Sequence, residues 1–388
     1  MSRKQTRFAL VVLVAVILGI AYKLSTSSQQ PTLTDEPVRA HTQTQDSDAE
    51  AQTPPNLRRI VAPLVISTLA QEDSGPGSTQ GRVIAQAAWG SGPDQLGHIR
   101  PQEANPEAPM SFTIGADGTL LVVDQTNRRI QRFGRDGRPL GSIPLAVGAA
   151  QDIAMGRDGS MAVMDRLIDR TVSIMGPDGR ERGRLALAGT GIDHTGSVTG
   201  VFVDGTDVYA ERQHGPLVRV GSTDGTSTGE RTEVPGRPTR DGTAWVSVGS
   251  VDMQAGKLYI NAVARPSEQH MYTRELHLPL QIRQVVMLDS DRQGIVYLAV
   301  QGVTAAAAAQ AASQAAAQDA EVREPAGQVL LVCVDLASGR STGQATLPVN
   351  TSADETFREI VVRDEGGVVY AVRSEQGVEY REYRCGGH

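Results

Sequence analysis

Three things are scarce in this sequence: aromatic residues, cysteine and positive charge. Aromatic residues make up 4% of the 388 residues, too few to assemble stacking platforms for single-stranded nucleic acid. The formal net charge is −7, with 37 basic and 44 acidic residues, which argues against a polyanion as the main partner. Two cysteines cannot support a disulfide-scaffold fold or a multi-cysteine zinc site. Nucleic acid is therefore not an expected partner.

Local catalytic motifs are missing as well. The sequence contains no serine-centred nucleophile elbow, no phosphate-cradling glycine loop and no His-Glu-His helix motif. Its histidines follow no repeated spacing, whereas a bound cation needs several converging ligands. They are His41, His98, His194, His214, His270, His277 and His388. We therefore expect neither a metal nor another cofactor.

The apolar content is sufficient for a folded protein. Hydrophobic residues make up 39% of the chain, and there are 41 glycines, a composition typical of globular domains. At 388 residues, the chain exceeds the length at which one compact core stops growing. The length therefore predicts either two small domains or one large closed architecture.

The N-terminus carries the clearest targeting signal. Three basic residues precede an uninterrupted apolar run from Phe8 to Tyr22, which Lys23 closes. As a helix, this run extends about 23 Å, and with a snorkelling lysine it could span a bacterial inner membrane. Residues 1–24 are predicted to be a signal anchor that contacts the membrane through residues 8–24. Because basic residues stay on the cytoplasmic side, the C-terminal domain is expected in the periplasm.

A cleaved signal peptide is the alternative, because Gly19-Ile20-Ala21 offers the small residues that a signal peptidase needs. The domain would then be secreted or periplasmic.

Residues 25–57 are rich in small and polar residues and are predicted to be a disordered linker. Residues 58–81 form an accessory segment. Its apolar run from Ile60 to Leu69 predicts a strand or lid on the main domain or, less often, a docking segment for a partner.

A repeat of about 45 residues organises the remainder of the chain, as is typical of stacked supersecondary units. Short β-branched runs alternate with tight turns that begin with Asp-Gly, a strong hairpin signal. These turns are Asp117-Gly118, Asp136-Gly137, Asp158-Gly159, Asp178-Gly179, Asp204-Gly205 and Asp224-Gly225. Proline-containing segments close the units and suit outermost strands. Among them are Ile143-Pro144-Leu145, Glu233-Val234-Pro235, Leu278-Pro279-Leu280 and Leu347-Pro348-Val349.

Four short strands per unit predict the blades of a β-propeller. Six units begin near Phe112, Asp152, Thr199, Trp245, Arg283 and Phe357. The last unit lacks an outer strand after Tyr383, and residues 82–89 are predicted to supply it from the N-terminal side. Such a closure removes a free sheet edge. The expected fold is thus an all-β, six-bladed β-propeller over residues 82–388.

The first repeat resembles a known family. Asp117-Gly118-Thr119-Leu120, leading through residues 123–133 to Asp136-Gly137, is similar to an NHL repeat. The second unit follows the same pattern less closely. The resemblance implies a six-bladed propeller of the NHL or TolB-like type. That family includes binding modules, RNA binders and a few metal-dependent enzymes, so the fold does not determine the function.

The candidate binding residues lie beyond second strands and near blade connections, where propellers commonly bind ligands. They are Arg128, Arg129, Asp169, Arg170, His194, His214, Arg265 and His270. Asp124 and Asp165 end second strands, where an aspartate usually accepts hydrogen bonds from loop amides. We therefore expect these two to be structural and assign no catalytic residue.

Two further features lie in the last two units. An alanine-rich stretch within residues 303–327 predicts a short helix, because alanine is the best helix former. It is either a simple loop expansion or the border of a partner site.

Cys333 and Cys385 could form a disulfide in an oxidising compartment, which would stabilise the fold by roughly 4 kcal/mol. Two free thiols are the alternative.

Two functions from different classes are compatible with these patterns. The first is a non-enzymatic, membrane-tethered extracytoplasmic propeller that binds a protein partner or acts as a scaffold in the bacterial cell envelope. The alternative is a metal-dependent hydrolase or lyase of the lactonase or amidating-lyase type, with calcium or zinc in the central channel. RNA binding is disfavoured by export, acidity and the scarcity of aromatic residues.

The anchor can be tested directly. If Phe8 to Tyr22 remains in the mature protein, the chain should stay with membranes after a carbonate wash and keep its N-terminal residues in mass spectrometry. This outcome is expected because the apolar run, extended by a snorkelling Lys23 and Leu24, could span the membrane. Recovery of a soluble species that starts near Tyr22 would contradict the anchor and favour the cleaved signal.

Overall fold

The fold is seen in a computed structural model that describes residues 60–65, 81–103, 105–212, 215–318, 327–350, 352 and 354–386. The chain divides into two units, Met1–Pro55 and Asn56–His388, and all described residues belong to the second. The predicted anchor and linker lie outside the described residues. Within the described ranges, no helix has both the length and the apolar character needed to cross a membrane.

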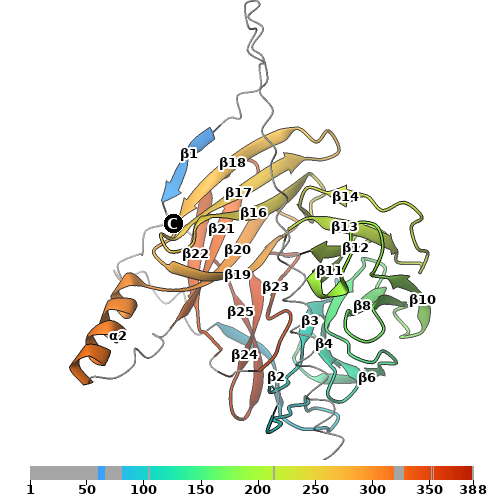
Figure 1. Cartoon of the computed structure of the whole chain (residues 1–388). Helices are drawn as coiled ribbons and strands as arrows, with labels where there is room; N and C mark the ends of the chain where they lie inside the picture. Colours follow the sequence, from blue (N-terminus) through green and yellow to red (C-terminus); the bar gives the residue numbers. More distant parts are fainter. Residues whose placement is uncertain are drawn as a thin grey trace, which may run out of the picture. The chain divides into compact units, whose positions relative to one another are not determined.

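The second unit forms six β-sheets that are arranged as the blades of a propeller (Figure 1). Within each blade, strands that follow one another in the chain pair in antiparallel fashion. First strands of neighbouring blades contact one another around a central channel, for example β3 with β7 and β19 with β23. The predicted all-β, six-bladed fold is therefore confirmed.

The strand bounds show how each blade is built from the channel outward. Blades 1 to 3 contain β3 (Ser111–Ile114), β4 (Leu120–Asp124), β5 (Arg129–Phe133) and β6 (Pro139–Pro144); β7 (Asp152–Met155), β8 (Met161–Asp165), β9 (Thr171–Met175) and β10 (Glu181–Ala186); and β11 (Val198–Asp204), β12 (Asp207–Arg212), β13 (Leu217–Ser222) and β14 (Glu233–Val234). A short 3₁₀ turn, Thr195–Ser197, precedes β11.

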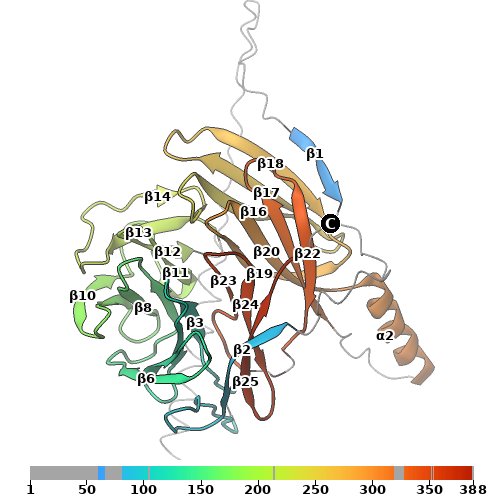
Figure 2. The same ribbon diagram turned by 180° about the vertical axis from the view of Figure 1, so that it is seen from behind.

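Blades 4 to 6 follow the same order. They contain β15 (Arg237–Pro238), β16 (Ala244–Asp252), β17 (Lys257–Ala264), β18 (His270–His277) and β1 (Ile60–Val65); β19 (Gln281–Ser290), β20 (Ile295–Val303), β21 (Gln328–Asp335) and β22 (Ser341–Leu347); and β23 (Ile360–Val362), β24 (Val368–Arg373), β25 (Gly377–Tyr383) and β2 (Arg82–Ala88). Helix α2 (Ala305–Gln318) lies between β20 and β21 and projects from blade 5 (Figure 2).

Burial follows the position of each strand in its blade. Every residue of β4 and of β8 is buried, because a blade packs between two neighbours and its middle strands are covered on both faces. The outer strands β6 and β10 each bury a single residue, Ile143 and Leu185. The continuous apolar runs of the second strands and the polar outer strands therefore reflect the same geometry.

The first and second strands of a blade are joined by turns that glycine and aspartate stabilise. In blade 1, Gly118 has a φ of 81°, a region that favours glycine. The Asp117 carboxylate accepts a hydrogen bond from the Thr119 amide at 2.9 Å. In blade 4, Asp241 binds the Thr243 amide in the same way at 3.1 Å. Because Asp and Gly form the turns between strands, the spacing of Asp-Gly pairs in the sequence follows the blade repeat.

The fourth blade differs from the sequence prediction. That blade begins at β15 and not near Trp245, because a two-residue strand and the turn at Asp241-Gly242 come first. All later strands of the blade therefore shift by one position. The Leu278-Pro279-Leu280 segment is a blade connection and not an outer strand. The outer position belongs to β18, to which β1 adds a fifth, parallel strand, so the accessory segment does supply a strand.

Five apolar clusters hold neighbouring blades together, and each spans one joint of the ring. They fill the joints between blades 1 and 2, 2 and 3, 4 and 5, 5 and 6, and 6 and 1. Among the described residues no such cluster spans the joint between blades 3 and 4. The side chains that bridge this joint are charged, as the site geometry below shows. The ring is thus apolar at five joints and polar at one.

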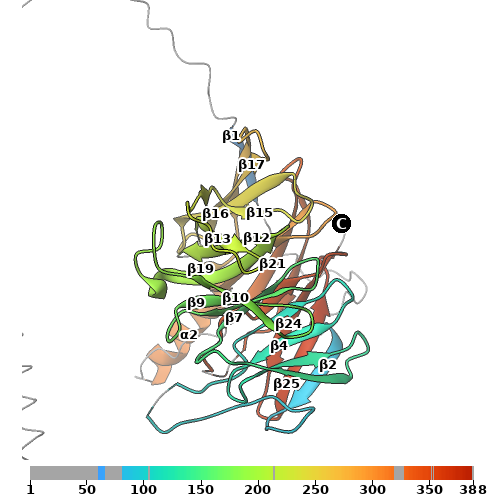
Figure 3. The same cartoon turned by 90° about the vertical axis from the view of Figure 1, so that its right-hand side faces the viewer.

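The ring is closed by strands from the two ends of the propeller. β2 pairs with β25 in antiparallel register from Arg82↔Glu382 to Ala88↔Gly377. The two strands lie side by side at the opposite ends of the sequence colour scale (Figure 3). Ala85 and Ala87 are buried in the joint between blades 6 and 1. The predicted closure by residues 82–89 is confirmed.

The C-terminal tail adds a covalent link. A disulfide joins Cys333 on β21 to Cys385, which follows β25. The adjacent amide of Gly386 donates a hydrogen bond to the Gln344 carbonyl on β22 at 3.2 Å. Blade 5 and the end of blade 6 are therefore tied together next to the closing strand.

Removal of β2 should loosen the whole ring and not one blade alone. A chain that starts at Pro109 loses β2 and exposes the edge of β25, so it should melt at a lower temperature and aggregate. A chain that starts at Asn56 keeps β1 and β2 and serves as the control. Thermal unfolding followed by circular dichroism compares the two. A cooperative transition at the same temperature in both chains would contradict this account of the closure.

Candidate functional site

The two ends of the channel carry different loops. The turns between first and second strands lie at one end, which we call the hairpin face. The connections between blades lie at the other end, together with the loops between second and third strands, and we call this end the connection face. This division follows from the alternating strand directions in each blade.

Two of the predicted binding residues are equivalent arginines on the connection face. Arg128 and Arg170 both precede a third strand, both have a φ of 55°, and both side chains are exposed. Their backbone carbonyls accept hydrogen bonds from Leu145 and Leu187, respectively. The backbone is therefore fixed in the same way in blades 1 and 2, while both guanidinium groups are left to solvent.

The Arg129 side chain, by contrast, has a structural role. Its guanidinium group binds the buried Asp124 carboxylate at 2.8 Å and the carbonyls of Gly92 and Gln95 at 2.8 and 2.7 Å. Asp124 also accepts from the Gly97 amide. In blade 2, Asp165 accepts hydrogen bonds from the amides of residues 149, 167 and 168. The expected structural role of Asp124 and Asp165 is confirmed.

The other predicted residues do not form one group. Asp169 lies on the connection face next to Arg170 and is 3.5 Å from Arg184. His194 is exposed and precedes the 3₁₀ turn before β11. His214 lies outside the described residues. Arg265 and His270 lie on the hairpin face, because the additional first strand in blade 4 reverses the face on which this loop emerges. The prediction that His270 lies near the blade connections is therefore wrong.

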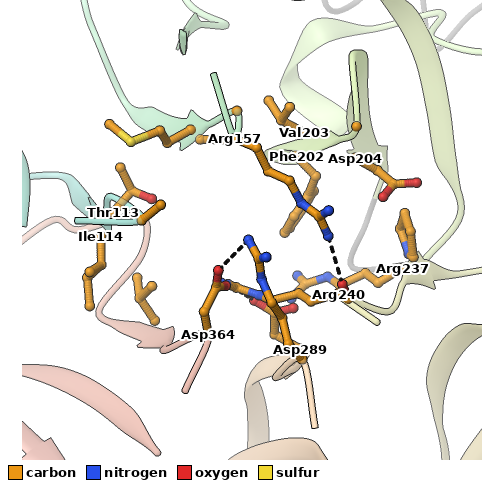
Figure 4. Close-up of a pocket in the computed structure, with 18 of the residues that line it drawn as sticks. Thr113, Ile114, Arg157, Phe202, Val203, Asp204, Arg237, Arg240, Asp289 and Asp364 are labelled. Atoms are coloured by element: carbon orange, nitrogen blue, oxygen red, sulfur yellow. Dashed lines mark hydrogen bonds and ion pairs between the residues drawn. The ribbon is translucent and has the colours of Figure 1, made fainter. Parts of the chain in front are cut away.

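The sequence analysis missed a charged cavity at the hairpin end of the channel (Figure 4). Its volume is about 120 Å³, and all six blades contribute to its lining. Five arginines and three aspartates carry its charge: Arg157, Arg237, Arg240, Arg292, Arg358, Asp204, Asp289 and Asp364. Apolar side chains such as Ile114, Met155 and Val361 complete the wall.

A sequence signal for this cavity does exist. The second residue of the turn after each first strand lies at the rim of the channel. In blades 2, 4 and 5 this residue is an arginine, namely Arg157, Arg240 and Arg292, and in blade 6 it is Asp364. In blade 1 it is Ala116. Alignment of the repeats on their turns, and not on their strands, would have brought these residues into one ring.

Ion pairs hold most of these arginines in place. Arg240 binds Asp289 at 2.7 Å and Asp364 at 2.9 Å, and Arg292 binds Asp364 at 2.6 Å. Burial alone would raise the pKa of Asp289, but Arg240 and Arg237 outweigh it and hold that pKa below the ordinary value. Burial opposes the charge of Arg240, yet the two aspartates raise its pKa. Asp289 and Arg240 are therefore charged at neutral pH.

A further ion pair lies deeper in the channel. Arg358 binds the fully buried Asp152 at 2.6 Å and covers the Phe202 ring at 4.8 Å. Burial raises the pKa of Asp152 despite Arg358, and its Oδ1 has no hydrogen-bond partner.

Charged side chains also bridge the polar joint between blades 3 and 4. Arg237 binds Glu211 at 2.7 Å and stacks over Phe202 at 4.2 Å, while Arg265 binds Asp204 at 2.7 Å. Glu211 is almost completely buried, with a side-chain exposure of 3%. Burial, together with the charges of Asp207 and Asp204, raises the pKa of Tyr209 to about 12. Arg237 therefore both lines the cavity and joins the two blades.

The part of the chain that the structure describes contains no group of three or more His, Cys, Asp or Glu side chains placed to hold a metal ion. His194 precedes the 3₁₀ turn on the connection face, whereas His270 begins β18 on the hairpin face. His270 contacts Thr273 at 3.0 Å.

Comparisons with known proteins give distant structural likenesses. No family model matches the chain, and no curated protein does; the NHL resemblance thus rests on the repeat residues alone. A member of the DUF4221 family from Bacteroides vulgatus is 10% identical over 79% of this chain and 98% of its own, with a TM-score of 0.45. Virginiamycin B lyase from Staphylococcus aureus is 11% identical over 74% and 99%, with a TM-score of 0.38. At these values the likeness carries no argument about function.

Arg237 should be unusually sensitive to substitution, because it bridges the polar joint between blades 3 and 4. Arg237→Met removes the guanidinium group that pairs with the buried Glu211 carboxylate, which should lower the free energy of unfolding by about 3 kcal/mol. Arg219→Met is the matched control, because the Arg219–Asp207 pair is about one-third exposed and should contribute less than about 1 kcal/mol. Urea unfolding at pH 7 measures both variants. Equal losses in the two would contradict the role assigned to Arg237.

Proposed function

We propose that the chain is a non-enzymatic binding module: an extracytoplasmic β-propeller, tethered to the bacterial inner membrane, that binds a protein partner of the cell envelope. The tether and the location rest on the basic and apolar pattern of residues 1–24. The binding face is the connection face of blades 1 and 2, where the repeat residues resemble those of NHL propellers.

The observation that carries this proposal is a small surface that the fold does not use. Arg128 and Arg170 project from equivalent loops of neighbouring blades, and between the second and third strands of blade 2 lie Leu167 and Ile168. These two apolar side chains are 54% and 64% exposed. Arginine and large apolar side chains on a rigid backbone are typical of interface hot spots.

The polar groups that resembled catalytic residues support the same conclusion. Asp124 and Asp165 are buried and saturated with hydrogen bonds from the fold. In the channel, the charged lining consists of arginines and aspartates, most of which are paired. Fixed charges of this kind hold a ligand by electrostatics and hydrogen bonds.

The metal-dependent alternative makes a different prediction for metal content. A calcium or zinc site needs carboxylate or imidazole ligands that converge, whereas Asp289 and Asp364 in the channel are bound by Arg240. Stoichiometric calcium or zinc in the purified protein would favour the hydrolase or lyase function. Its consistent absence in protein purified without chelator would favour the binding module.

A pair of charge reversals tests the binding face. The variant Arg128→Glu/Arg170→Glu should lose the envelope partner captured by cross-linking in intact cells, because the favourable charges of the interface are inverted. Quantitative mass spectrometry of the cross-linked complexes compares this variant with the unmodified chain.

The matched control is Arg138→Glu/Arg180→Glu. These arginines are 85% and 90% exposed, lie in the same two blades and occupy the turns before the outer strands on the hairpin face. The control should capture the partner as the unmodified chain does, and both variants should keep the melting temperature. Equal capture by both variants, or loss in both, would overturn the assignment of the connection face.

A further inference from the structure

The hairpin end of the channel has the features of a small-anion site, and it lies on the face opposite to the proposed protein-binding surface. Its cavity of about 120 Å³ has several times the volume that a single water molecule requires. It is smaller than the pockets that bind drug-sized ligands. Its size therefore suits a compact organic molecule.

The charge of the cavity is positive although the chain as a whole carries −7. The lining contains five arginines and three aspartates. Glu211 and Asp152 outside the lining neutralise Arg237 and Arg358, while Arg265 neutralises Asp204. Arg240 and Arg292 are matched by Asp289 and Asp364. One lining arginine is left without a counter-ion.

That arginine is Arg157. In the described ranges, no carboxylate lies within 4.0 Å of its guanidinium group. Its Nη2 donates a hydrogen bond to the backbone carbonyl of Arg240 at 3.2 Å, so the side chain reaches across the mouth of the cavity (Figure 4). The neighbouring Arg240 and Arg292 are held by their aspartates and surround the same opening. A bound anion would supply the missing negative charge.

The walls favour an organic anion over an inorganic one. Ile114, Met155, Val203, Pro238 and Val361 bring apolar groups into the lining. Apolar walls exclude water and strengthen the attraction between a guanidinium group and a carboxylate. Guanidinium groups also match the planar geometry of a carboxylate.

We propose that this cavity binds a small organic monocarboxylate, whose carboxylate pairs with Arg157 and whose short apolar body lies against Met155 and Val361. The ring of turn residues formed by Arg157, Arg240 and Arg292 defines the mouth of the site. Binding replaces the hydrogen bond between Arg157 and the Arg240 carbonyl with a charge-assisted one. The proposed site binds the carboxylate without catalysing a reaction, and this binding does not depend on the protein partner on the connection face.

Titration calorimetry of the full chain in detergent tests the site with acetate, butyrate and hexanoate. Butyramide serves as the uncharged isostere of butyrate, and phosphate serves as the inorganic anion. At least one monocarboxylate should bind with one-to-one stoichiometry, more tightly than either butyramide or phosphate. Its affinity should fall as sodium chloride is raised, because salt screens the guanidinium charge.

Two variants make the test specific to the cavity. Arg157→Gln should weaken binding by about tenfold or more, because a charge-assisted hydrogen bond is lost. Arg180→Gln removes the same charge from the same blade and the same face, outside the cavity lining, and should change the affinity less than twofold. Both residues are exposed, so neither variant should change the melting temperature.

Three results would overturn the proposal: no binding of any monocarboxylate, equal affinity for phosphate and the best-bound monocarboxylate, or unchanged affinity of that monocarboxylate in Arg157→Gln. The second of these would indicate a general anion site. Partner capture on the connection face is measured in separate variants, so the failure of one proposal leaves the other intact.

Discussion

The structure depends on the pairing of β2 with β25. Without it, blade 6 would end in an unpaired sheet edge, and its main chain would contact the start of blade 1 chiefly through the Phe357 and Arg358 amides, which donate to the Met110 carbonyl. The pair joins residues that are 300 positions apart, such as Arg82 and Glu382, so its formation costs considerable loop-closure entropy. That cost is offset by the main-chain hydrogen bonds of the pair and by the apolar cluster that β2 completes between blades 6 and 1.

The closure has further support on both sides. The segment after β2 is fixed by Arg129 and Asp124 from blade 1 and by the Trp89 side chain, which donates to the Ser374 carbonyl at 2.9 Å. On the other side, the disulfide between Cys333 and Cys385 holds the end of blade 6 to blade 5. A closed ring positions the six inner strands, and only then do Arg157, Arg240 and Arg292 surround one cavity. The charged site is therefore a consequence of closure.

Much of the architecture could be predicted from the sequence because the relevant signals are local. The Asp-Gly turns and the buried second strands repeat at a regular spacing, and an unpaired final blade implies a strand from elsewhere. The fourth blade was placed incorrectly because β15 has two residues, one of them Pro238, and carries no recognisable strand pattern. That single error moved Arg265 and His270 to the wrong face. The accessory strand β1 could be expected, but its parallel pairing with β18 depends on tertiary structure.

The cavity was missed because its residues come from all six blades, and their common position is visible only when the repeats are aligned on their turns. Arg157, Arg240 and Arg292 are second residues of ordinary turns, and their convergence requires the curvature of the ring. The polar joint between blades 3 and 4 was also hidden, since Arg237 and Glu211 lie 26 residues apart. The strands on either side gave no sign that their joint would be bridged by charge and not by apolar packing.

Native-state hydrogen exchange of the full chain tests the central claim, that pairing between β2 and β25 controls the stability of the whole ring. If it does, the hydrogen-bonded amides of β2 should exchange as slowly as those of β4 in blade 1 and β20 in blade 5, through global unfolding. Protection should then fall together in all three strands as denaturant is added. Fast, independent exchange of β2 while β4 and β20 remain protected would show that the ring is stable without its closing strand, and would contradict the account.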